Sequence, residues 1–257
     1  MTQYLICQYQ GLFTIVSKEV RRFMRIWIQT LLPAPITAFL YFMVFTQALS
    51  VGSNAIHFSV FMSPGLILMS MMNNSFSNTV GSFFGSKFQH HIEEILISPL
   101  EPIIILLGFT LGGILRGLLI GILVYLISLG FEWYSVHSWP LVLALSFLTT
   151  MLFSLAGLFN AIYATKFDDI SVIPTFVLTP LIYLGGIFYS IQQVKGWLYQ
   201  ITLYNPIYYL IEAFRGAMLG SSLVSIPYVL ISLCIINMLF FILNWILIAR
   251  RVGMGTS

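Results

Sequence analysis

Long apolar stretches follow one another along this chain, separated by short polar segments. A helix needs about 20 apolar residues to cross the roughly 30 Å hydrocarbon core of a bilayer. The stretches that approach or exceed this length lie at 31–49, 58–84, 103–129, 141–164, 172–189 and 227–249. Because backbone polar groups inside lipid must bond within their own segment, these stretches predict an all-α polytopic membrane protein with six transmembrane helices.

The composition agrees with lipid as the surrounding solvent. The chain is 59% hydrophobic and only 7% charged, whereas soluble domains are roughly half apolar and about a quarter charged. The spans occupy the whole length, so residues 1–257 are predicted to form a single membrane domain. The start does not resemble a secretory signal peptide, because no small-residue cleavage site follows it. Cys7 and Cys234 fit no metal or redox spacing and are predicted to be free thiols.

The segment 12–27 has apolar residues at helical spacing together with several basic side chains. The basic residues are Lys18, Arg21, Arg22 and Arg25. A helix of this kind lies in the headgroup layer, and the anionic lipids of the cytoplasmic leaflet favour it there. We therefore expect an interfacial helix in contact with membrane lipids, with an ordinary packing helix as the alternative. The net charge of +3 then marks the cytoplasmic side and does not indicate a nucleic-acid partner.

The apolar segment 197–219 is interrupted by Asn205-Pro206 and carries Glu212 and Arg215. If it crossed the membrane fully, the basic C-terminal end of the chain would lie opposite the basic N-terminal segment, against the positive-inside rule. The segment is therefore predicted to be a re-entrant outer hairpin before the last span. Both termini then lie in the cytoplasm.

The stretch KFQHHIEEILISPLEP, residues 87–102, concentrates charge in a chain that is otherwise almost without it. Ile92, Ile95 and Leu96 form a short apolar stripe, and Pro99 and Pro102 end the helix. This pattern predicts a cytoplasmic surface helix that either supports the spans or meets a cytosolic partner. The candidate docking residues are His90, His91, Ile92, Glu93, Glu94 and Leu96.

The residue spacing in this stretch does not match that of a zinc peptidase or of a P-loop. Zinc peptidases place two histidines four residues apart on one helix face, whereas His90 and His91 are neighbours that point about 100° apart. The nearest approach to a P-loop is GSFFGSK at 81–87, which has the wrong glycine spacing. We therefore expect no catalytic or metal site in this chain, and any ATP-driven work requires a second polypeptide.

Polar residues inside the predicted membrane segments are the remaining functional candidates. Asn74 and Asn78 share one helix face and either bond a neighbouring helix or line a wet path. Arg116 lies well inside the third span without a partner that the sequence identifies. Glu212 and Arg215 are three residues apart and can pair, either as a structural ion pair or as part of a gate.

Aromatic residues gather near the expected outer ends of the fifth span and the hairpin, either as an interfacial belt or as contacts for an amphipathic substrate. The complete set of pathway or gate candidates is Asn74, Asn78, Tyr183, Phe188, Tyr189, Asn205, Glu212 and Arg215.

Three motifs carry a resemblance to a known family: EEILISPLEP, LGGIFYS and NPIYYLIEAFRGAML. With the basic helix before six spans, they make nearly the whole chain similar to the permeases of type 2 ABC transporters. The resemblance implies that the loop after the second span is a coupling helix seated on an ATPase subunit. It also implies a homodimer or pseudo-dimer of permeases, with two ATPase subunits that bind ATP and magnesium, in a bacterial inner membrane.

The expected function is therefore that of a non-enzymatic transport subunit, exporting an amphipathic, lipid-linked or drug-like substrate. Few charges line the expected path, which disfavours a small ion. An ion-driven secondary transporter and a membrane scaffold or assembly factor are the alternatives. Secondary transporters place ionisable groups for ion coupling near the midplane, and Arg116 does not resemble a proton or sodium site.

Overall fold

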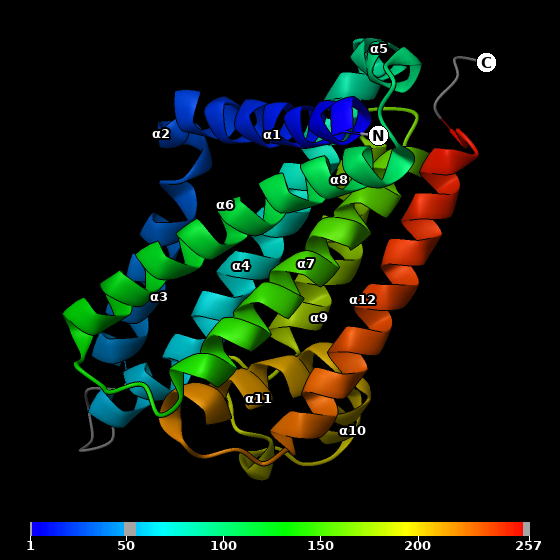
Figure 1. Cartoon of the computed structure of the whole chain (residues 1–257). Helices are drawn as coiled ribbons and strands as arrows, with labels where there is room; N and C mark the ends of the chain where they lie inside the picture. Colours follow the sequence, from blue (N-terminus) through cyan, green and yellow to red (C-terminus); the bar gives the residue numbers. More distant parts are fainter. Residues whose placement is uncertain (1, 49–54, 254–257) are drawn as a thin grey trace.

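The computed structural model describes residues 2–48 and 55–253, and every regular element within them is a helix. The rods that run between the two ends of the bundle are α3 (Pro33–Ala48), α4 (Ala55–Phe88), α6 (Pro102–Phe131), α7 (Trp139–Tyr163), α8–η1–α9 (Asp169–Val172, Ile173–Leu178, Thr179–Tyr183) and α12 (Ile226–Ala249) (Figure 1). The prediction of an all-α polytopic membrane protein is confirmed.

Each predicted span coincides with one of these rods. Among the described helices, α6, α7 and α12 are long and apolar enough to cross a membrane, while α3 and α8–α9 are apolar but shorter. α4 is 34 residues long and carries the polar positions near its middle. The predicted end of the span 172–189 is wrong, because α9 stops at Tyr183 and Gly186 then turns the chain with a positive φ of 78°. Leu49, the predicted end of the first span, lies outside the described residues.

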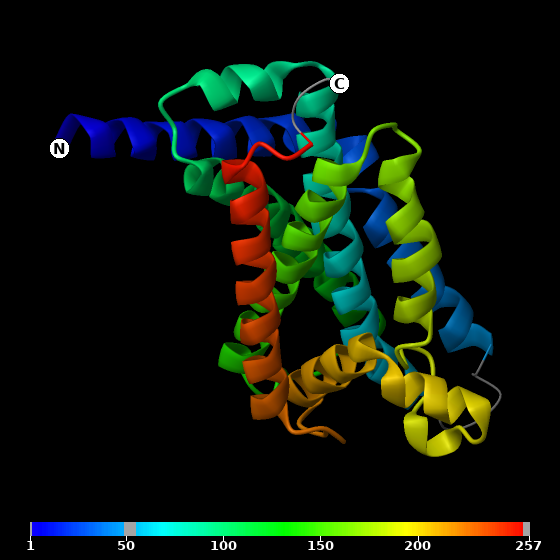
Figure 2. The same ribbon diagram turned by 90° about the vertical axis from the view of Figure 1, so that its right-hand side faces the viewer.

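Different elements cover the two ends of the bundle (Figure 1; Figure 2). One end, called here the α1 end, carries α1 (Thr2–Arg25) lying across the rods, α2 (Trp27–Thr30) and α5 (His91–Ile97). The opposite end, called the α11 end, carries η2 (Ile191–Gln193), α10 (Trp197–Tyr204) and α11 (Pro206–Leu219). α12 returns to the α1 end, so the two described ends of the chain lie on the same side.

α4 packs between α6 and α7 at the centre of the bundle, and glycines allow these helices to approach closely. Gly113 of α6 faces the Ser75 backbone carbonyl of α4, where an added Cβ would lie only 3.0 Å from the oxygen. On α7, a Cβ added at Gly157 would lie 2.6 Å from the backbone oxygen of Phe76. The obstacle at Gly157 is therefore backbone, which cannot give way as a flexible side chain can.

We expect Gly157→Ala to lower the stability of the protein by about 1–3 kcal/mol, because α7 must move away from α4 to admit the methyl group. Thermal unfolding of the purified protein in mild detergent measures the effect. Gly81→Ala is the matched control, since a Cβ at Gly81 meets no atom within 4 Å. That control should be neutral or slightly stabilising, because alanine is the better helix former. Equal unfolding temperatures for both variants would contradict this account of α4–α7 packing.

Candidate functional site

α5 stands at the surface of the α1 end, in the loop between α4 and α6 (Figure 2). His90 reverses the chain after α4 with a left-handed backbone conformation, φ 61°. Ile92 is 1% exposed and packs into the bundle, whereas Glu93 and Glu94 are exposed. Ile97 is 81% exposed. Ile92 therefore anchors α5 to its own chain, and the surface available to a partner is formed by the charged residues and Ile97.

The loop that follows α5 is held by the first turns of α1. The Tyr4 hydroxyl donates to Glu101 Oε1 at 2.7 Å. The Gln8 amide donates to the Pro99 carbonyl at 2.8 Å and accepts from the Glu101 backbone N–H at 3.1 Å. These contacts form a clamp between α1 and the α5–α6 loop.

The other charges of the stretch 87–102 have local structural roles. The Lys87 ammonium donates to the carbonyls of Ile162 and Ala164 at 2.9 and 2.7 Å, and so satisfies the free carbonyls at the end of α7. His90 Nδ1 lies 3.2 Å from Glu93 Oε1. Within the described residues, no three His, Cys, Asp or Glu side chains are grouped as metal ligands.

The boundaries of α1 differ from the predicted segment 12–27. The helix begins earlier, at Thr2, and ends two residues earlier, at Arg25, and α2 begins separately at Trp27. Lys18, Arg21 and Arg25 are exposed, as an interfacial helix requires. Arg22, however, turns toward the bundle and is only partly exposed. The buried face of the helix includes Glu19, which the sequence reading did not single out.

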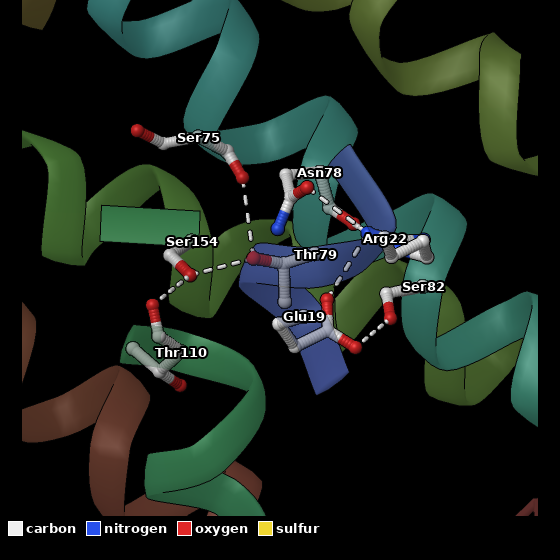
Figure 3. Close-up of polar contacts among 8 residues, drawn as sticks. All are labelled: Glu19, Arg22, Ser75, Asn78, Thr79, Ser82, Thr110 and Ser154. Atoms are coloured by element: carbon white, nitrogen blue, oxygen red, sulfur yellow. Dashed lines mark hydrogen bonds and ion pairs between the residues drawn. The ribbon is translucent and has the colours of Figure 1, made fainter. Parts of the chain in front are cut away.

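Glu19 and Arg22 tie α1 to α4 (Figure 3). The Glu19 side chain is 0% exposed, pairs with Arg22 at 3.0 Å and accepts a hydrogen bond from the Ser82 hydroxyl. Arg22 also donates to the backbone carbonyl and the side-chain oxygen of Asn78, at 3.2 and 2.9 Å. Burial raises the pKa of the Glu19 carboxyl above its ordinary value, although Arg22 and Ser82 act in the opposite direction.

A second set of polar contacts joins the three central helices beside this pair (Figure 3). The hydroxyls of Thr79 on α4 and Ser154 on α7 lie 2.6 Å apart, and Ser154 donates to the Thr110 carbonyl of α6 at 2.9 Å. Interhelical hydrogen bonds of this kind stabilise helix association in lipid. Asn78, on the same helix as Thr79, makes its side-chain contact with Arg22 of α1 and so takes part in helix packing.

Asn74, one turn before Asn78, lies in a different setting. Its side-chain oxygen accepts from Arg116 Nη2 of α6 at 3.2 Å, and the same nitrogen donates to the Thr30 carbonyl at 2.9 Å. Asn74 and Arg116 line a cavity of about 280 Å³ between α3 and α4, called here the α3–α4 cleft. Its further lining is Gln29, Thr30, Pro33, Ala34, Thr37, Ala38, Tyr41, Leu66, Met69, Ser70 and Asn73.

An aromatic cluster joins α3 to the end of α9. The hydroxyls of Tyr41 and Tyr183 lie 2.5 Å apart. Phe188 stacks on Tyr183 with ring centroids 5.9 Å apart, and on Phe45 of α3 at 5.1 Å. The structure therefore brings two of the sequence candidates, Tyr183 and Phe188, into contact with each other and with Tyr41, one of the residues that line the α3–α4 cleft.

Tyr189 and Asn205 hold the turns of the α11 end. The Tyr189 hydroxyl donates to the Leu184 carbonyl at 2.9 Å. The Asn205 side chain accepts from the Ile207 backbone N–H at 3.0 Å, as an N-cap does, and donates to the Leu181 carbonyl at 2.6 Å. Both side chains are bound to backbone groups of neighbouring turns, so their observed contacts are structural.

Glu212 and Arg215 form an ion pair on α11, and each side chain is 5% exposed. Arg215 also donates to the carbonyls of Gly186, at 2.8 Å, and Phe61, at 3.3 Å, and its guanidinium lies 3.8 Å from the Phe61 ring centroid. Glu212 accepts from the Leu223 backbone N–H at 3.2 Å. The pair thus links α11 to α4, to the turn after α9 and to the segment before α12.

The candidates therefore fall into three groups: the α5 surface at the α1 end, the α3–α4 cleft with the aromatic cluster, and the buried pair of α11. Sequence reasoning missed Glu19, the Tyr4–Gln8 clamp and Ile97. A signal for Ile97 was present, since it continues the apolar run of α5. For Glu19 and the clamp no local signal exists, because their partners are distant in the sequence.

Comparison with known proteins gives three results. A sequence model of the ABC-2 type transporter family matches residues 10–219. The inner membrane transport permease YadH of Escherichia coli (strain K12) is 45% identical over 247 residues, which cover 95% of this chain and 96% of that protein. Nodulation protein J of Neorhizobium galegae is 27% identical over 203 residues, covering 77% of this chain and 76% of that protein.

Proposed function

Because this chain belongs to the ABC-2 type transporter family, and is thus a multi-pass inner-membrane subunit of an ABC transporter, we propose that it exports an amphipathic, lipid-linked or drug-like substrate. A separate cytosolic ATPase supplies the energy and holds the ATP and magnesium. Two ATPase subunits act on two copies of this permease, which form a homodimer. The chain itself is a transport subunit and catalyses no reaction.

α5 is the ATPase-docking element in this proposal. The observation that carries it is the protruding surface of His91, Glu93, Glu94 and Ile97 on a helix that is anchored by Ile92. A docked partner would bury the Ile97 side chain, which is 81% exposed, and so gain a favourable apolar contact beside the charged residues. The clamp from α1 gives the docked helix a mechanical link to the rest of the bundle.

The α1 end faces the cytoplasm in this proposal, and so do both termini. The exposed cations of this end support that orientation, since cytoplasmic loops carry an excess of lysine and arginine. They are Lys18, Arg21, Arg25, Lys166, Arg250 and Arg251. The α10–α11 hairpin then lies on the outer side as a re-entrant element.

We expect Glu94→Arg to abolish copurification of the ATPase, or to uncouple its ATP hydrolysis, when the permease is coexpressed with candidate ATPases from neighbouring genes. The physical reason is that reversal of one exposed charge in a docked surface places like charges together at the interface. Copurification and ATP hydrolysis of the complex in mild detergent are the two measurements.

Asp168→Arg is the matched control, because Asp168 is exposed in the loop between α7 and α8 and undergoes the same charge change outside α5. It should leave assembly and hydrolysis unchanged. Ile97→Asp tests the same surface with a different chemistry and should also weaken docking. If no ATPase copurifies with the wild-type permease, the proposed energy coupling is rejected, and the ion-driven transporter and scaffold alternatives are reopened.

A further inference from the structure

Arg116 is a cation in the middle of an apolar helix, and its observed hydrogen-bond partners are all neutral. Its guanidinium donates to the Thr30 backbone carbonyl and to the Asn74 amide oxygen. Its Nε is buried and has no hydrogen-bond partner among the described residues. An arginine inside a membrane segment is costly, and such residues are normally paired or face a functional cavity.

The two other arginines that turn into the bundle are neutralised. Arg22 pairs with Glu19, and Arg215 pairs with Glu212. Within the described part of the chain, Arg116 forms no ion pair with a carboxylate. The described part of the chain therefore supplies a carboxylate counter-charge to Arg22 and to Arg215 but none to Arg116.

The α3–α4 cleft has a polar and an apolar part. Thr30 and Asn74 contact the guanidinium, and the other polar lining residues, such as Gln29 and Asn73, are also uncharged. Apolar side chains and one tyrosine make up much of the remaining wall: Ala34, Ala38, Tyr41, Leu66 and Met69. Thr37 of the same wall is exposed and Asn73 is half-buried, so the cleft is reached from outside the bundle.

We propose that the α3–α4 cleft binds the anionic headgroup of a membrane amphiphile, with Arg116 as its counter-charge. Guanidinium groups recognise phosphate and carboxylate oxygens through paired N–H donors. The volume of about 280 Å³ is near the lower limit for small-molecule sites, roughly 300–1,000 Å³. It therefore fits a headgroup and the first part of a chain, while the rest of the amphiphile lies in the bilayer.

This ligand deepens the proposed function, because it gives the transported substrate a negative charge and an entry point between α3 and α4. The transport role rests on the proposed function, but the binding does not. A cation would be repelled by Arg116, and a neutral lipid would leave the guanidinium without a counter-charge. The aromatic cluster that begins at Tyr41 lies next along α3 from the polar part of the cleft.

The test uses phosphatidylglycerol as an anionic probe and phosphatidylethanolamine as its zwitterionic comparison. Purified permease without any ATPase is titrated with each lipid in detergent, and bound lipid is counted by native mass spectrometry. A photoactivatable phosphatidylglycerol then maps the site. We expect preferential binding of phosphatidylglycerol, and crosslinks within residues 29–41 or 66–74.

Asn74→Asp is the decisive variant, because its carboxylate would neutralise Arg116 while keeping the hydrogen-bond acceptor that the guanidinium now uses. We expect it to weaken phosphatidylglycerol binding by about tenfold, the equivalent of one lost charge-assisted hydrogen bond, and to remove the mapped crosslinks. Arg116→Gln should have the same effect, while Arg116→Lys keeps the charge and should retain most of the binding. Arg250→Gln, an exposed arginine at the end of α12, is the matched control and should bind as the wild type does.

Undiminished phosphatidylglycerol binding by a folded Asn74→Asp permease would overturn the proposal, and so would crosslinks outside the cleft. Displacement of the lipid by millimolar inorganic phosphate would overturn its amphiphile part, because the site would then recognise the anion alone. If the Arg116→Gln variant does not fold, lipid binding by the Asn74→Asp variant still tests the proposal. The lipid-binding measurements need no ATPase, so they can be interpreted even if the docking experiment fails. A failure of lipid binding likewise leaves the docking experiment interpretable.

Discussion

Arg215→Ala is expected to destabilise the permease by about 3–5 kcal/mol, because it leaves the buried Glu212 carboxylate without its counter-charge. The carbonyl of Gly186 loses its charged donor in the same step, and the Phe61 ring loses the cation that lies over it. Helix α11 should therefore lose its contacts with α4 and with the turn after α9. The thermal unfolding temperature in detergent measures the effect, with Arg250→Ala as the exposed control.

The exchange of the two charges tests whether the pair is more than a simple salt bridge. In the double variant Glu212→Arg with Arg215→Glu, opposite charges still face each other. The carbonyls of Gly186 and Phe61 would then face a carboxylate, and the Leu223 N–H would face a guanidinium. We therefore expect only partial rescue. Full rescue would show that the ion pair alone matters, and an Arg215→Ala variant as stable as the wild type would reject the structural role.

Glu19→Lys is the second change with a large expected effect, again about 3–5 kcal/mol, because it places a cation beside Arg22 at a position that is 0% exposed. Glu19→Gln should be much milder. Since burial raises the pKa of this carboxyl, the folded protein disfavours the charged form, and a neutral amide of the same shape suits the site. Glu19→Ala should lie between the two, because it leaves a cavity and removes the partner of Arg22.

The raised pKa of Glu19 also gives the sign of a pH effect. A carboxyl whose pKa is higher in the folded than in the unfolded state favours folding at low pH, and this contribution is lost as the pH rises through the folded pKa. The unfolding free energy of the wild type relative to Glu19→Gln should therefore be larger at pH 4 than at pH 7. The comparison of the two proteins cancels the titration of other groups. A difference that grows toward pH 7 would mean that Arg22 outweighs burial.

Much of the architecture follows from the sequence, because the signals for it are local. Apolar runs of about 20 residues identify the spans, and Asn205-Pro206 marks the break between α10 and α11. The α5 helix was equally visible, since a charged segment inside so apolar a chain has to lie at the surface. The three-residue spacing of Glu212 and Arg215 was enough to predict that they pair.

The ends of the helices and the faces that they bury were harder to predict from the sequence, for a physical reason. In lipid, the outside of the bundle is as apolar as its inside, so the amphipathic pattern that reveals the buried face of a soluble helix is absent from most spans. Arg22 illustrates the point on α1, where a cation counted with the exposed basic residues turns into the bundle to meet Glu19 and Asn78. Ile92 is a second case, since its place in the apolar stripe did not show whether that stripe met a partner or the chain itself.

By itself, then, the sequence determined that the chain forms helices in a membrane, roughly where most of them run and which loop carries a charged surface helix. These features follow from helix length, hydropathy and turn residues, which act within about 20 neighbours. Only the tertiary structure decided which polar groups meet. The Tyr4–Glu101, Arg22–Asn78 and Arg116–Asn74 contacts join residues 97, 56 and 42 positions apart. Such contacts depend on the way the helices pack against one another, which no local pattern encodes. The clamp, the contacts between α1 and α4 and the proposed anion site all depend on them.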